Sequence, residues 1–167
     1  MAVRHQLIGR NPDQVWAVLA DPDRYSDWVV GVFDSSVGRG EWPAVGADLR
    51  YEVRFGPWRG HGRTVVRRSQ PAEAIELEAD SGPLGTARIA VELRSWGEHE
   101  CLAVLDEHPL RGTAGTLHNF VLDSFIQLRH RTMLGRLAAV AEESAPPRRP
   151  GRSPEAVGRR TAEEERS

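Results

Sequence analysis

The chain has 167 residues, of which 40% are hydrophobic, and its formal net charge is −2. This length fits one domain of about 100–200 residues, and the nearly balanced charge excludes the strongly basic footprint of a nucleic-acid-binding protein. All 22 basic residues are arginine, so Schiff-base catalysis and a Walker-type phosphate site, which both need lysine, are excluded as well.

Cysteine use and hydropathy predict the compartment. Cys101 is the only cysteine, so the chain cannot form an intramolecular disulfide, which is compatible with a reducing cytosol. The first residues, 1–6, lack the apolar run of a signal peptide. No stretch approaches the roughly 18 apolar residues of a membrane span. We therefore expect a cytoplasmic protein that does not insert into a membrane.

The N-terminal part predicts one strand followed by two short helices. Residues 3–10 are rich in apolar side chains and form the expected strand. Asn11 and Pro12 then give a helix start, with an asparagine N-cap and proline at the first helical position. A second short helix is expected to restart at 21–23 and to include Tyr25 and Trp28.

From residue 31 the hydrophobic period changes to two. Apolar and polar side chains alternate over 49–55, 75–80 and 87–94, as in half-buried strands. Glycine and proline turn signals separate these runs, and 101–107 completes the set. Such short connections allow hairpins but no crossover helices, so the sequence predicts an antiparallel meander.

The remaining chain divides into a helix and a tail. Apolar residues recur at helical spacing from about 116 to 143, which predicts one long helix of roughly 40 Å that can cross the whole sheet. Residues 144–167 are rich in arginine, proline and glutamate and have no periodicity. We therefore expect a folded domain at 1–143 and a disordered tail at 144–167.

Residues 11–28, Asn-Pro-Asp-Gln-Val-Trp-Ala-Val-Leu-Ala-Asp-Pro-Asp-Arg-Tyr-Ser-Asp-Trp, carry a resemblance to a known family. With the order of elements, this segment resembles the START and Bet v 1-like (SRPBCC) superfamily, especially its bacterial polyketide cyclase/dehydrase and lipid-transport branch. The resemblance implies an α+β helix-grip fold: a curved, seven-stranded antiparallel sheet around a long C-terminal helix, with two short helices between strands 1 and 2. Members of that superfamily include ligand carriers, cyclising and hydroxylating enzymes and transcription-linked modules.

A single curved sheet on one helix cannot fill its concave side with aliphatic side chains alone. Large side chains or a ligand must occupy the remaining space. Eight residues are the expected ligand-binding set: Trp28, Phe33, Tyr51, Phe55, Trp58, Arg111, Phe120 and Phe125. Each aromatic member has core packing as its alternative role, and Arg111 pairs either with an anionic group of the ligand or with solvent.

Candidates for catalysis are few. The histidines show no HxH or HxxxH spacing and Cys101 has no CxxC partner, so we expect no metal and no cofactor. His108 and His118 are the only weak catalytic candidates, as a pair that meets across the loop between the last strand and the long helix. The alternative, which we favour, is that both are turn and cap residues.

Three functions remain open on this basis. The first is a non-enzymatic carrier or sequestering protein for a small, largely hydrophobic molecule. The second is a polyketide aromatase/cyclase that acts in the same cavity. The third is a protein-interaction module with a vestigial cavity. We expect a monomer or homodimer, with no nucleic acid as partner.

Overall fold

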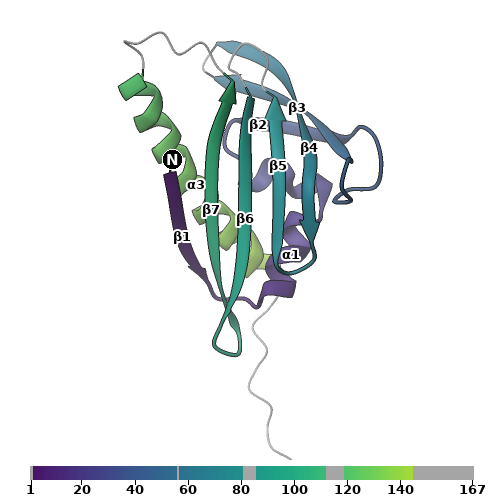
Figure 1. Cartoon of the computed structure of the whole chain (residues 1–167), viewed down its shortest axis with the longest axis vertical. Coiled ribbons are helices and arrows are strands. Elements are labelled where there is room, and N and C mark those ends of the chain that lie inside the picture. The colour runs from purple at the N-terminus through teal and green to yellow at the C-terminus, as the bar shows by residue number, and fades with distance from the viewer. Residues whose placement is uncertain (1, 56, 81–85, 112–118, 145–167) are drawn as a thin grey trace, which may run out of the picture.

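The computed structural model describes residues 2–55, 57–80, 86–111 and 119–144 (Figure 1). Its elements are, in chain order, β1 (Ala2–Ile8), α1 (Pro12–Leu19), the 3-10 turn η1 (Pro22–Arg24), α2 (Tyr25–Trp28), β2 (Val32–Val37), β3 (Asp48–Phe55), β4 (Trp58–Gln70), β5 (Ala74–Asp80), β6 (Thr86–Trp96), β7 (Glu100–Arg111) and α3 (Asn119–Ser144). The predicted order of one strand, two short helices, a run of strands and a long helix is confirmed.

The seven strands form one sheet in the order β1-β7-β6-β5-β4-β3-β2. Every neighbouring pair is antiparallel, so the predicted meander is confirmed from β2 to β7. β1 is added at the far edge beside β7, so the first strand of the chain pairs with the last. The sheet therefore has two edges, β1 and β2.

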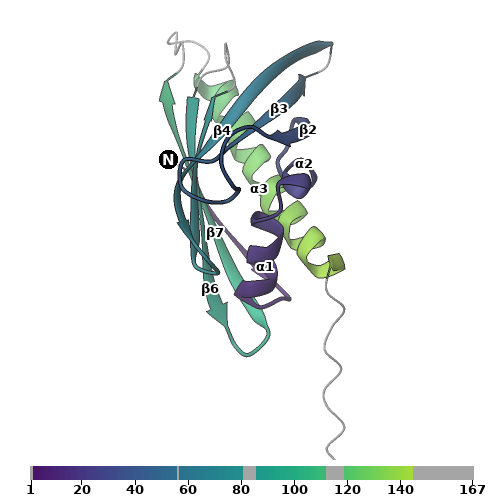
Figure 2. The ribbon, with the colours of Figure 1, turned by 90° about the vertical axis from the view of Figure 1, so that its right-hand side faces the viewer.

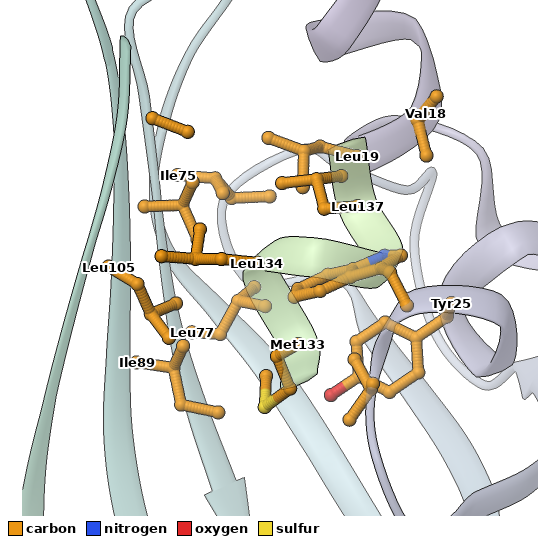
Figure 3. Packing of buried hydrophobic residues seen from close by; sticks show 14 of the residues in the cluster. Val18, Leu19, Tyr25, Ile75, Leu77, Ile89, Leu105, Met133, Leu134 and Leu137 are labelled. Carbon is orange, nitrogen blue, oxygen red and sulfur yellow. The ribbon is translucent and has the colours of Figure 1, made fainter. Parts of the chain in front are cut away.

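The three helices lie on one side of the sheet, as the side view shows (Figure 2). We call the sheet face toward the helices the inner face and the opposite face the outer face. The core lies between the inner face and the helices (Figure 3). Its largest fully buried side chains are Trp28, Tyr25, Ile8, Leu19, Leu49, Ile75, Leu77, Ile89, Leu105, Met133 and Leu137.

Local sequence signals explain where the helices begin and end. Asn11 and Gln14 form a capping box, in which each side chain accepts a hydrogen bond from the other residue's backbone N–H, at 3.0 and 3.2 Å. At the other end of the domain, the Glu142 carboxylate accepts a hydrogen bond from the Gly9 N–H at 2.9 Å. This contact fixes the last turn of α3 to the end of β1.

One boundary prediction was wrong. The sequence predicts a loop from His108 onward, but β7 continues to Arg111. The reason is that β6 starts early enough to pair with this segment: Arg88 lies opposite His108, and Thr86 lies opposite Arg111.

Among the described residues, no helix is both long enough and apolar enough to cross a membrane.

Candidate functional site on the inner face

The inner face changes from long to short side chains toward the end at which β7 finishes. One row across β4, β5 and β6 consists of the buried side chains Val66, Leu77 and Ile89. The next row toward that end consists of Thr64, Ala79 and Ala87. These shorter side chains take up less of the space between the sheet and the helix layer. At this level the side chains of the sheet therefore project least toward the helix layer.

Aromatic side chains border this row on the side of β3. Asp21 caps η1 by accepting a hydrogen bond from the Asp23 N–H at 3.0 Å, and α2 follows directly. This turn brings Tyr25 under the sheet, where its hydroxyl hydrogen-bonds the Thr64 hydroxyl at 2.8 Å. The Tyr25 ring lies edge-on to Trp28, with 5.6 Å between centroids, and 5.8 Å from the ring of Tyr51.

Tyr51 reaches this cluster because the residue opposite it has no side chain. It pairs in register with Gly62 on β4. A Cβ atom built on Gly62 would lie 2.3 Å from Cε2 of Tyr51, so any larger residue would collide with the ring. The tyrosine ring thus occupies the space beside Gly62, and only 5% of the residue is exposed.

Glu107 brings a carboxylate to the same face. It alternates along β7 with Asp106 and His108, and it is only 5% exposed. In register it lies opposite Ile89 and is therefore a diagonal neighbour of Ala87. We call Tyr25, Tyr51, Thr64, Ala79, Ala87 and Glu107 together the inner-face site.

The structure places the predicted ligand-binding residues on two different sides. Trp28 and Tyr51 are buried, at 2% and 5% exposure, within the core cluster. Phe33 is 61% exposed and lies over the guanidinium of Arg54, 4.0 Å from the ring centroid. A register shift between Val32 and Asp34 interrupts the regular pairing of β2 at Phe33, and the side chain of Phe33 points away from the core.

Five other candidates lie in described backbone, but their side chains are outside the described part of the chain. Phe55 is the last residue of β3, Trp58 the first of β4, and Arg111 the last of β7. Phe120 and Phe125 likewise belong to the first turns of α3. Their role as ligand contacts stays a prediction.

The structure separates His108 from the inner-face site. Its Nε2 atom lies 2.9 Å from the carboxylate of Asp106, two residues earlier on the same face of β7. That face is the outer one, because the intervening Glu107 and the neighbouring Leu105 are buried against the helices. His118 lies outside the described residues. Within those residues, no group of three histidine, cysteine or acidic side chains is placed to hold a metal.

A pocket opens mainly on the outer face, although Tyr51 and Gly62 also line it. Its volume is about 530 Å³, and its walls come from β2, β3, β4 and the end of β5. The side chains around it are mostly charged or polar, among them Arg50, Glu52, His61 and Arg63. Such walls would leave apolar groups of a ligand beside charges, so this pocket does not match the predicted ligand.

A seven-stranded antiparallel sheet that packs on a long C-terminal helix, with two short helices after β1, is the helix-grip fold. The aromatase/cyclase Zhui from Streptomyces sp. R1128 shares it with a TM-score of 0.70 at 15% identity, over 85% of this chain and 93% of that one. A protein from Thermus thermophilus has a TM-score of 0.66 at 12% identity, over 87% and 99%. DynU16, from the dynemicin biosynthetic locus, has a TM-score of 0.63 at 19% identity, over 87% of this chain and 48% of that one.

The sequence itself defines the family. The model of the polyketide cyclase/dehydrase and lipid transport family matches residues 2–142, and the chain belongs to this family. No curated protein sequence matches the chain. The structural neighbours are too distant in sequence to carry more than the fold.

Proposed function

We propose that this protein binds a small, largely apolar molecule between the inner face of the sheet and α3, as a carrier or sequestering protein. The observation that carries the proposal is the inner-face site, where a row of short side chains lies beside buried aromatic rings in an otherwise aliphatic face. The family's description, which includes lipid transport, points in the same direction.

The energetics of such binding are adequate. A ligand that loses about 300 Å² of apolar surface gains roughly 7 kcal/mol from burial, at about 25 cal/mol per Å². Immobilising the ligand costs part of this gain, while van der Waals contacts and a hydrogen bond add to it. A dissociation constant in the micromolar range is therefore a reasonable expectation.

The second candidate function is that of a polyketide aromatase/cyclase. The family description and the similarity to the aromatase/cyclase Zhui favour it. Against it stands the position of His108 on the outer face, where it cannot reach a substrate on the inner face. An enzyme would have to use other groups of the inner face, and Glu107 is the only described carboxylate buried there.

Titration with an environment-sensitive fluorescent dye tests the proposal. The dye should bind and then be displaced by at least one member of a panel of fatty acids, isoprenoids and aromatic polyketides. Tyr51→Ala should weaken binding several-fold. Phe33→Ala is the matched control, because it also removes one aromatic ring but from an exposed position.

Two outcomes would favour the alternatives. Absence of any apolar ligand below about 100 μM would mean that the space is filled, and the interaction-module hypothesis would gain. Conversion of a polyketide by the purified protein, abolished by a substitution on the inner face, would establish the enzyme.

A further inference from the structure

A cavity lies between β1 and α3, apart from the inner-face site. β1 is an edge strand of the sheet and packs beside α3 (Figure 1). The volume of the cavity is about 530 Å³, within the range of small-molecule sites. We call it the β1–α3 cavity. The described residues that line it come from these two elements: Val3, Arg4, His5, Gln6, Arg131 and Leu134.

The β1–α3 cavity leads from the surface toward the core. On its outer side, Val3 is 45% exposed, and Arg131 is exposed as well. On its inner side, Leu134 is only 3% exposed and extends from α3 toward the sheet (Figure 3). In register, Arg4 lies opposite the buried Leu105 of β7. A molecule in this cavity can therefore keep a charged end at the mouth and place an apolar chain against Leu134.

The charge at the mouth of the cavity is positive. Arg4 and Arg131 both line it, and none of the described residues that line it is acidic. Arg4 is half-buried and has a contact within the protein, and Glu107 is its diagonal neighbour on the inner face. That carboxylate compensates at most one of the two charges. Within the described part of the chain, no ion pair includes Arg131, so a positive charge remains at the mouth.

We propose that the β1–α3 cavity binds an amphipathic monoanion, a molecule with one carboxylate and an apolar chain. The carboxylate accepts hydrogen bonds from the Arg131 guanidinium, whose planar donors match two carboxylate oxygens, and Arg4 adds positive charge beside it. The chain lies against Leu134, where burial of apolar surface stabilises the complex. The inference goes beyond the proposed function, because it concerns another cavity and holds whether or not the inner-face site binds a neutral molecule.

Octanoate, 1-octanol and acetate separate the contributions of charge and chain. Their affinities for the full-length protein can be measured at pH 7 by NMR titration, in which the shifted amide signals should belong to β1 and α3. Octanoate should bind about tenfold or more tighter than 1-octanol, because it gains hydrogen bonds between two charged groups. It should also bind about tenfold or more tighter than acetate, which has the charge but lacks the chain.

Arg131→Gln should lower the preference for octanoate over 1-octanol by about fivefold or more, since it removes the charge from an exposed position and keeps a polar side chain. Arg136→Gln is the matched control: it makes the same change at an exposed position of α3 that does not line the cavity. Tyr51→Ala changes the inner-face site and should also leave the preference unaltered. A purely structural role of Arg131 would lower the melting temperature without changing the ratio of the two affinities.

The outcomes distinguish this inference from the proposed function. A wild-type preference for octanoate below about threefold over either control molecule would overturn the inference, and so would an Arg131→Gln variant that keeps the wild-type preference. The proposed function would stand in both cases if neutral members of the ligand panel bind and Tyr51→Ala weakens them. A preference for octanoate that depends on Arg131, in a protein that binds no neutral ligand, would support the inference and contradict the proposed function.

Discussion

Tyr51 and Gly62 show how one residue shapes the inner face. The tyrosine ring occupies the volume that any side chain at Gly62 would need, since a Cβ there would come within 2.3 Å of the ring. The ring in turn contacts Tyr25, whose hydroxyl is bonded to Thr64. The position of the aromatic cluster thus depends on a glycine in the middle of a strand.

The ion pair between Asp48 and Arg63 gives a pH-dependent prediction. The hydrogen bond from the Arg63 guanidinium, at 2.7 Å, lowers the pKa of the Asp48 carboxyl below its ordinary value. A lowered native pKa means that the stabilisation is complete above the unfolded-state pKa, near 4, and is lost as the pH falls through the native pKa. Asp48→Asn should therefore lower the free energy of unfolding by about 1–3 kcal/mol at pH 7.

Urea denaturation at pH 7 and at several values below pH 4 measures this effect. The difference between wild type and Asp48→Asn should shrink as the pH falls below 4. Glu52→Gln, at an exposed position on the same face of β3, should change stability little at either pH. A difference that stays constant down to pH 2 would show that the charge of Asp48 is not the source of its contribution.

For individual residues, the sequence predicted part of the inner-face site. Tyr51 could be assigned to the inside because it falls in an alternating strand, and Trp28 because it belongs to the segment that resembles the family. Phe33 could not be placed, because the register shift in β2 changes the direction of its side chain. Glu107 was also missed. Both faces of β7 carry aliphatic residues near it, such as Val104 and Leu105, so alternation alone did not indicate which acidic residue points inward.

Among the elements, α3 packs against the sheet and against both other helices. Its described part contacts β1, α1 and α2, and Met133, Leu134 and Leu137 are buried in the core. Leu137→Asp would place a charge on this buried stripe, at a cost of several kcal/mol against a total stability of about 5–15 kcal/mol. We expect insoluble or unfolded protein.

Solubility on expression and circular dichroism of any soluble fraction would measure this effect. Ala139→Asp introduces the same charge two residues later, at an exposed position of the helix, and should leave the fold intact. A soluble Leu137→Asp protein with native stability would mean that the buried face of α3 is wrongly assigned.

The elements themselves differ in how well the sequence predicts them. The strands β3, β5 and β6 alternate regularly, and the sequence predicts them well. β4 is less visible, because Gly60 and Gly62 replace apolar residues on its inner face while arginines continue on the outer face. The end of β7 was missed because Pro109 indicated a loop, although pairing with β6 continues past it.

At the scale of the molecule, residues 144–167 are predicted to be dispensable for folding. Their composition cannot offset an ordering cost of about 1–2 kcal/mol per residue. The last turn of α3 is anchored without them, by the hydrogen bond between Gly9 and Glu142. Truncation after Ser144 should therefore leave the melting temperature within about 2 °C of the full chain. A melting temperature about 10 °C lower in differential scanning calorimetry would show that this segment packs on the folded domain.

The proposed function places a small molecule between the sheet and the long helix, and the family description, which includes lipid transport, agrees with this proposal. Family and fold together do not name the ligand, because the same architecture holds carriers and enzymes. Under the proposed function, we expect the aromatic rings and short side chains of the inner face to select the ligand.

Native mass spectrometry of the full-length protein, purified from its own host, tests this central claim most directly. We predict an additional mass that corresponds to one small apolar molecule per chain and that is lost at higher collision energy. The Tyr51→Ala variant should carry less of it, and Phe33→Ala should carry as much as the wild type. A wild-type spectrum that contains only the bare chain, from protein that also fails to bind the ligand panel, would contradict the account.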